Sequence, residues 1–94
     1  MGITYRVVCH EQVIARDIPL LSREWRGKIK SAIETKLVSR PEVFGIPLRN
    51  TLKGYRKLRV GNYRIIFRIE SKTIKIFVVG HRRSVYHTSN KRMV

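Results

Sequence analysis

The chain has 94 residues, 43% of them hydrophobic, which is typical of one globular domain over residues 1–94 and excludes a disordered chain. It carries 21 Lys and Arg against 6 Asp and Glu, a net charge of +15, and its single cysteine excludes an internal disulfide and a multi-cysteine metal site. No apolar run reaches the roughly 20 residues of a membrane span, and the N-terminus does not resemble a signal peptide, so a soluble cytoplasmic protein is expected.

The positive charge is concentrated in the second half of the chain. Residues 1–48 carry eight basic and five acidic side chains, whereas residues 49–94 carry thirteen basic side chains and one acidic side chain, Glu70. Such an excess repels itself, and phosphate backbones or an acidic protein partner are its usual counterparts. The asymmetry therefore favours a nucleic-acid ligand over charge kept only for solubility.

The first half predicts one strand and two helices. Ile3–Cys9 is rich in β-branched residues, as strands are, and Glu11–Ile18 has the apolar spacing of a short helix. Ser22 is placed to cap a second helix, which runs to Arg40–Pro41. Two helices joined so closely predict an antiparallel hairpin. Residues 41–54, with two prolines and two glycines, are expected to form a loop.

The second half predicts a three-stranded antiparallel meander. A Gly61-Asn62 turn of type II′ pairs Val60 with Tyr63, and Arg59 with Arg64. A second turn at Ser71-Lys72 continues the pattern and places Val79 beside Arg64. One face then carries the apolar side chains, with Arg56 as the one exception, and is expected to form the core; its apolar members are Leu58, Val60, Tyr63, Ile65, Phe67, Ile69, Ile74, Ile76 and Val78. The fold class is therefore α+β.

The opposite face of the meander collects basic side chains. It pairs Arg59 with Arg64 and Arg68 with Lys75, although like charges opposite one another destabilise a sheet. Five basic side chains without a carboxylate favour an anion-binding face over a merely solvated one.

The sequence GHRRSVYH, residues 80–87, follows the last strand and adds further polar groups. It offers no metal-ligand spacing, no phosphate-binding loop and no serine triad, so neither a metal nor a cofactor is expected. RNA cleavage by the substrate's own 2′-hydroxyl needs a base, an acid and positive charge on the transition state. Tyr86 is a candidate base, His81 and His87 are candidate acids or bases, and the arginines supply the charge.

LKGYRKLRVGNYRIIFRI, together with the later GHRRSVYH, resembles the RelE/ParE superfamily of bacterial and archaeal toxins. The resemblance covers nearly the whole chain. It implies a toxin of a type II toxin–antitoxin system, with a cognate antitoxin as partner in a complex that can be of higher order. In the RelE branch it implies a metal-independent endoribonuclease that cleaves messenger RNA in the ribosomal A site and so inhibits translation.

The resemblance implies catalytic roles for Arg64, for one arginine after the last strand, Arg82 or Arg83, and for Tyr86, so all four are candidate catalytic residues. RNA or phosphate binding is expected of five further residues, Lys57, Arg59, Arg68, His81 and His87. A second lysine that the branch can carry is replaced here by Tyr55. Two alternatives remain: a ParE-like inhibitor of DNA gyrase, and a non-catalytic RNA-binding module in which Tyr55 and Tyr86 stack on bases.

Overall fold

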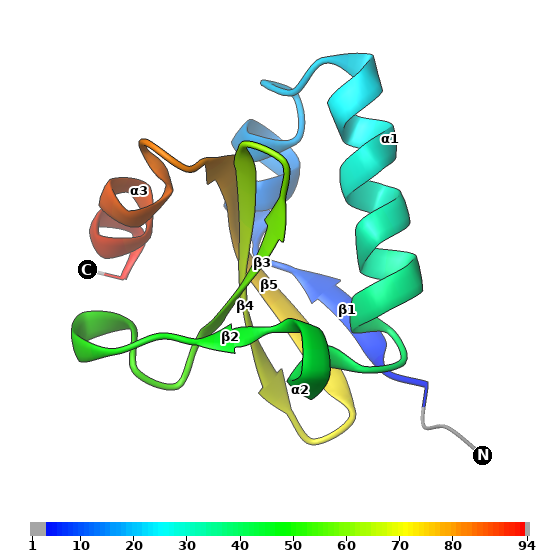
Figure 1. Cartoon of the computed structure of the whole chain (residues 1–94). Coiled ribbons are helices and arrows are strands. Elements are labelled where there is room, and N and C mark those ends of the chain that lie inside the picture. Colours follow the sequence, from blue (N-terminus) through cyan, green and yellow to red (C-terminus); the bar gives the residue numbers. More distant parts are fainter. Residues whose placement is uncertain (1–3, 94) are drawn as a thin grey trace.

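A computed structural model describes residues 4–93 as a mixed five-stranded sheet with helices on both faces. The strand order is β1-β5-β4-β3-β2. Figure 1 views the sheet nearly edge-on, with α1 on one side and α3 on the other. The elements are β1 (Arg6–Cys9), η1 (Val13–Asp17), α1 (Arg23–Ala32), η2 (Ile33–Leu37), α2 (Pro41–Phe44), β2 (Ile46–Pro47), η3 (Asn50–Leu52), β3 (Arg56–Val60), β4 (Tyr63–Glu70), β5 (Thr73–His81) and α3 (Val85–Arg92). Here η1 and η2 are short π-helical segments, and η3 is a single turn of 3-10 helix.

The predicted α+β class is confirmed, and the sheet is larger than the meander alone. β1 pairs with β5 in parallel, and β2 pairs with β3 in antiparallel fashion, so these two strands form the edges. Residues 41–54, which were expected to be loop, contain α2, β2 and η3. The predicted first strand began at Ile3, which lies outside the described residues.

Both predicted turns of the meander are confirmed. Val60 pairs with Tyr63 and Arg59 with Arg64, as the Gly61-Asn62 turn requires. Gly61 has φ +59°, which a type II′ turn needs at its first central residue. Ser71 also has a positive φ, +57°, in the turn that pairs Glu70 with Thr73.

The predicted register of β4 with β5 is correct only at the end near the Ser71-Lys72 turn. Phe67 pairs with Ile76, but Ile66 pairs with Val78, so Phe77 is an extra residue in a β-bulge. Beyond the bulge every pairing moves by one residue. Arg64 therefore lies opposite Gly80 rather than Val79, and Val78 lies on the face that α3 covers instead of the predicted core face.

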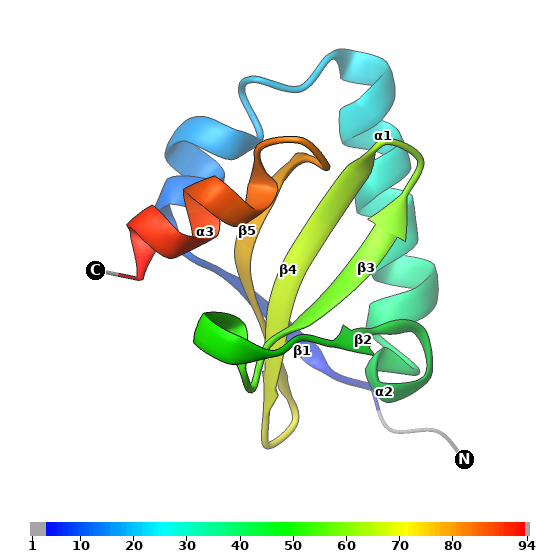
Figure 2. The ribbon, with the colours of Figure 1, turned by 60° about the vertical axis from the view of Figure 1, so that its left-hand side comes forward.

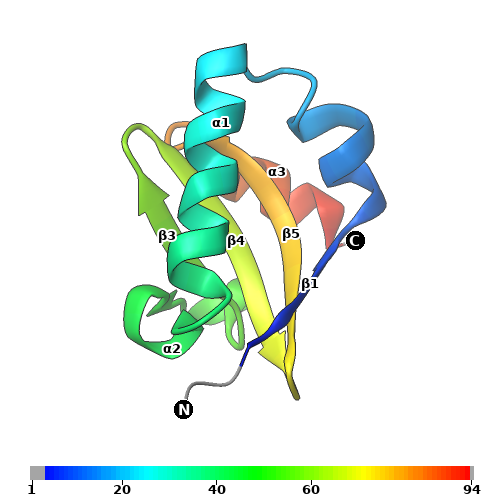
Figure 3. The same cartoon turned by 90° about the vertical axis from the view of Figure 1, so that its right-hand side faces the viewer.

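The main core lies between the sheet and the helical segments of the first half. Ile29, Leu37, Ile65 and Phe67 are among its fully buried members. Ser22 caps α1 as predicted, because its Oγ accepts the Trp25 N–H at 3.2 Å. Figure 3 shows the chain passing through η1 and then returning along the sheet as α1 and η2. In residues 4–93 no helix is long and apolar enough to cross a membrane.

The second face of the sheet carries a smaller apolar cluster beneath α3. Ile66, Val78 and Val85 are fully buried there, with Tyr55 and Phe77 packed against them. Figure 2 shows α3 lying over this face beside β5. The face that the sequence predicted to be basic is therefore partly covered, because residues 85–92 form an eight-residue helix over it.

Candidate functional site

The turn that follows β5 presents the two predicted catalytic arginines to solvent. Arg82 and Arg83 are exposed and lie between the end of β5 at His81 and the start of α3. The Arg82 N–H donates to the Asn62 carbonyl at 2.8 Å, which fixes this turn against the β3–β4 turn. Both guanidinium groups are therefore available to an anion at the end of the sheet where β3 and β4 turn.

Tyr86 and Lys57 come together beside this turn. Tyr86 stands in the first turn of α3, and its ring packs on the cluster under that helix. Lys57 projects from β3, with its Nζ 5.9 Å from the centroid of the Tyr86 ring. Both side chains are half-buried. This arrangement places the Lys57 ammonium group over the aromatic ring that carries the Tyr86 hydroxyl.

Arg64, for which the resemblance implies a catalytic role, is buried and bonded to the backbone. Only 7% of its surface is exposed, and its Nη1 donates to the carbonyls of Gly61 and Tyr63 at 3.0 and 2.9 Å. These bonds brace the β3–β4 turn from within. Arg59, opposite it on β3, is exposed and adds charge to the same end of the sheet.

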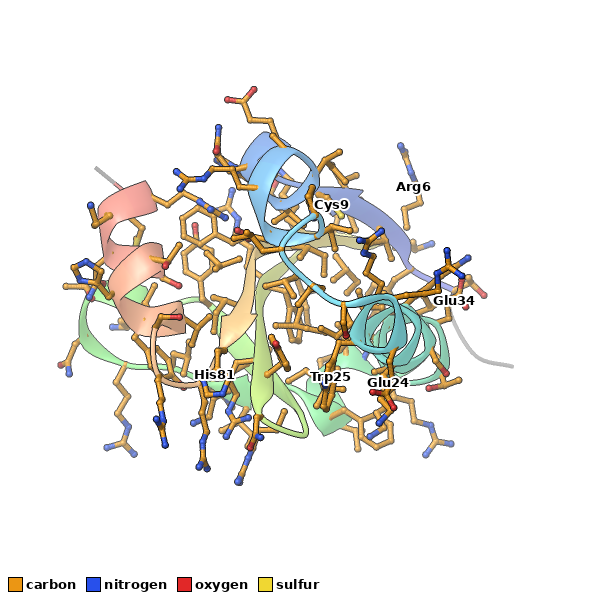
Figure 4. The ribbon with its side chains drawn as sticks, turned by 90° about the horizontal axis from the view of Figure 1, so that it is seen from above. Arg6, Cys9, Glu24, Trp25, Glu34 and His81 are labelled. Carbon is orange, nitrogen blue, oxygen red and sulfur yellow. The ribbon has the colours of Figure 1, made fainter. Side chains whose placement is uncertain are left out.

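His81 belongs to this end of the molecule, and its ring is engaged on two sides. Its Nδ1 accepts the Arg83 N–H at 3.2 Å, and its ring meets Tyr63 edge-on with centroids 5.6 Å apart. Tyr63 also contacts Trp25, with centroids 4.9 Å apart. Figure 4 shows His81 and Trp25 at this end, where nitrogen-tipped side chains extend outward. The Nδ1 contact leaves Nε2 to meet a ligand.

Arg68 lies elsewhere and is partly neutralised. Its Nη2 is 3.0 Å from a Glu70 carboxylate oxygen, and the Lys75 Nζ is 2.7 Å from the other oxygen. A carboxylate thus separates the like-charged pair, so the expectation of a face without carboxylates was wrong. The hydrogen bond from Lys75, and then the charges of Lys75 and Arg68, lower the pKa of Glu70 from its usual value. The Arg68 guanidinium also lies 5.8 Å from the centroid of Tyr55.

His87 is separated from Tyr86, although the two are consecutive. It is exposed and lines a surface hollow between η1 and α3 together with Gln12 and Arg16. Neighbouring residues of a helix point in different directions, which accounts for the separation. Within residues 4–93 no three His, Cys, Asp or Glu side chains form a group that could hold a metal ion.

Sequence reasoning missed a buried ion pair that joins η1, near the N-terminus, to the C-terminal helix α3. Asp17 of η1 and Arg92 of α3 are 7% and 9% exposed, and Arg92 Nη1 lies 2.9 Å from Asp17 Oδ2. The two residues are 75 positions apart, and no local pattern links them. The only signal in the sequence is that Asp17 follows Val13 at helical spacing, where an apolar side chain would be usual.

Comparisons with known proteins agree with this geometry. Residues 12–86 match the family described as the ParE toxin of the type II toxin–antitoxin system parDE. A comparison with curated proteins found no match.

Solved toxins share the fold. The toxin–antitoxin complex RelBE2 from Mycobacterium tuberculosis contains a chain with 29% identity and a TM-score of 0.78, the match covering 85% of this chain and 100% of that one. The archaeal RelE–RelB complex from Pyrococcus horikoshii also has 29% identity, with a TM-score of 0.61 and coverage of 85% and 97%. Free E. coli RelE, in a double arginine-to-alanine mutant, has 20% identity and a TM-score of 0.72, with coverage of 98% and 100%, a likeness of fold alone. The chain belongs to the RelE/ParE superfamily of type II toxins.

Proposed function

We propose that this toxin is a ribosome-dependent endoribonuclease that cleaves messenger RNA in the A site. The observation that carries the proposal is the meeting of Lys57 with Tyr86, beside the exposed Arg82 and Arg83. Lys57 and the two arginines offer positive charge to a phosphate, and Tyr86 offers a hydroxyl that can exchange a proton. Such a set suits cleavage of a phosphodiester that brings its own nucleophile.

In the proposed reaction the 2′-oxygen attacks the adjacent phosphorus, and the bond from phosphorus to the 5′-oxygen breaks. The products are a 2′,3′-cyclic phosphate and a 5′-hydroxyl. One group accepts the proton of the 2′-hydroxyl and another donates a proton to the leaving oxygen; Tyr86 and His81 are the candidates for these roles. Lys57, Arg82 and Arg83 stabilise the charge that grows on the phosphate oxygens.

Arg64 is also proposed to contact the phosphate, although its side chain is mostly buried. Its Nη1 is occupied by the turn carbonyls, so Nε and Nη2 remain for a phosphate. Arg59 is proposed to contact the RNA backbone near the turn. Arg68 and His87 lie away from Tyr86 and would bind a more distant part of the RNA or the ribosome.

The test is primer extension on messenger RNA in a purified translation system. Wild-type protein should cut the message only where a ribosome holds it, and Tyr86→Phe and Arg82→Met should each lose most of this cleavage. Lys72→Met is the matched control, since it removes an exposed cation at the other turn of the meander. Full cleavage by the Tyr86 and Arg82 variants would refute the site, and intact message with wild-type protein would refute the function.

A second candidate function is inhibition of DNA gyrase, the activity expected of a ParE-like toxin. The observation in its favour is the ParE description of the family that matches residues 12–86. A supercoiling assay with purified gyrase distinguishes the two functions. Loss of supercoiling together with intact message would favour this reading.

We also propose that a cognate antitoxin binds the apolar groove between η1 and α1. The groove is lined largely by aliphatic side chains, among them Ile14, which is 61% exposed. Ile14→Asp should weaken neutralisation by the antitoxin while leaving toxicity intact. Val43→Asp is the matched control, because Val43 is exposed on α2, away from the groove. Equal neutralisation of both variants would exclude the groove.

A further inference from the structure

The Asp17–Arg92 pair is built into the edge of β5. Its two hydrogen bonds form a bidentate contact, Nη1 to Oδ2 at 2.9 Å and Nη2 to Oδ1 at 3.1 Å. Asp17 Oδ2 also accepts the Val79 N–H at 2.9 Å, and Arg92 Nη1 donates to the Phe77 carbonyl at 2.9 Å. Each charged group therefore bonds both its partner and the backbone of β5.

The β-bulge creates these backbone positions. β1 ends at Cys9, and directly after it the His10 N–H donates to the Ile76 carbonyl of β5 at 2.8 Å. Consecutive carbonyls of a regular strand point to opposite sides, yet here the next carbonyl, that of Phe77, opens to the same edge. Among the described residues no strand pairs with this side of β5 beyond β1, and the ion pair bonds the Phe77 carbonyl and the Val79 N–H there.

The pair also anchors the helix that carries Tyr86. Val85 and Ser89 of α3 are fully buried, and Arg92 continues the same face at helical spacing. A helix of eight residues is marginal by itself, so its docking depends on these few contacts. With Val85 fixed at one end and Arg92 at the other, the rotation of α3 about its axis is set, and with it the direction of Tyr86.

We propose that Asp17 and Arg92 are positioning residues for the proposed cleavage site, acting by holding Tyr86 beside Lys57. This inference rests on the proposed function. It differs from a role in stability alone, because loss of the pair should lower the rate of the chemical step in protein that is still folded.

A double-mutant cycle tests the inference. Single-turnover cleavage would be measured with saturating toxin for wild type, Asp17→Asn, Tyr86→Phe and the double variant, each scaled by its folded fraction from near-ultraviolet circular dichroism. Asp17→Asn should lower the rate on the order of 10- to 100-fold with little change in the half-saturating concentration. In the Tyr86→Phe background it should have almost no further effect.

The control is Glu11→Gln, which neutralises an exposed carboxylate just before η1, the element that carries Asp17, and should leave the rate unchanged. If Asp17→Asn does not fold, Arg92→Lys replaces it, because lysine keeps the charge but loses the bidentate fork. An unchanged rate, or equal fold-losses in both backgrounds, would overturn the inference. So would a fully active Tyr86→Phe variant.

Failure of the proposed function is recognised separately, because wild-type protein would then not cut ribosome-bound message. Hydrogen exchange of the α3 amides still tests the anchoring itself. Exchange should accelerate in Asp17→Asn and stay as in wild type in Glu11→Gln. Equal protection of α3 in all three proteins would overturn the anchoring.

Discussion

Arg64→Met keeps most of the apolar stem of the side chain but removes the guanidinium that braces the β3–β4 turn. Wild-type Arg64 is 7% exposed and donates two hydrogen bonds, at 3.0 and 2.9 Å, to the carbonyls of Gly61 and Tyr63. The variant should therefore unfold more easily than wild type. Because the same turn holds the Arg82 N–H through Asn62, the variant should also loosen the turn that presents Arg82 and Arg83.

The size of the effect follows from the two bonds. A hydrogen bond from a charged donor contributes about 1.5–3 kcal/mol to stability when it is buried. Gly61 is exposed, so water can partly replace the guanidinium at its carbonyl. We therefore expect a loss of about 1–3 kcal/mol for both bonds together. In a domain of this size the loss lowers Tm by roughly 5–20 °C.

Urea unfolding followed by circular dichroism measures this loss, and Arg59→Met is the matched control. Arg59 stands directly opposite Arg64 but is exposed, and its removal relieves a like-charged neighbour. Its stability should stay the same or rise slightly. Equal midpoints for the two variants would show that the Arg64 bonds do not hold the turn.

Three further changes test other parts of the structure. Glu70→Gln should lower Tm in low salt, because the Lys75 and Arg68 charges lose the carboxylate between them, and added salt should shrink the difference. Since the pKa of Glu70 is lowered in the folded state, its contribution is fully present above the ordinary value of 4.5 and is lost as pH falls from there through the lowered folded-state pKa, so Glu70→Gln and wild type should unfold alike in stronger acid. Gly45→Ala would drive a Cβ into the Phe67 ring and the Pro41 carbonyl, and it should cost about 1–3 kcal/mol in urea unfolding. Gly27→Ala meets no atom within 4 Å in the middle of α1 and should instead gain about 0.5–1 kcal/mol.

The sequence predicts the β3–β4 hairpin correctly because two signals agree there. Gly61-Asn62 selects the turn, and the alternation of apolar and basic residues selects the same register. In β5 the signals do not agree, because residues 76–79 are all apolar and either face can accept them. A shift of one residue at Phe77 therefore exposes no polar group to the core, and the bulge leaves no trace in the pattern.

The candidate site is predictable in its residue types but not in its bonds. The sequence identifies Lys57 and Tyr86, which the structure brings together across 29 positions. It does not show that Arg64 is occupied by backbone carbonyls, because such bonds depend on how the turn closes. α3 is harder still, since after Val85 and Tyr86 it has no apolar stripe and its docking relies on the distant Asp17.

Two carboxylates, Asp17 and Glu70, determine where the positive charge of the chain remains unpaired in the folded protein. Asp17 neutralises Arg92 against the edge of β5, and Glu70 neutralises the cations at the other turn of the meander. The basic side chains near the β3–β4 turn form no ion pair within residues 4–93; they are Lys57, Arg59, Arg64, Arg82 and Arg83. Mutual repulsion among them opposes folding, and an anion bound there would relieve it. Carboxylates placed this way pair with cations at the side of β5 and at the Ser71-Lys72 turn, and they leave unpaired positive charge at the end where a phosphate backbone is proposed to bind.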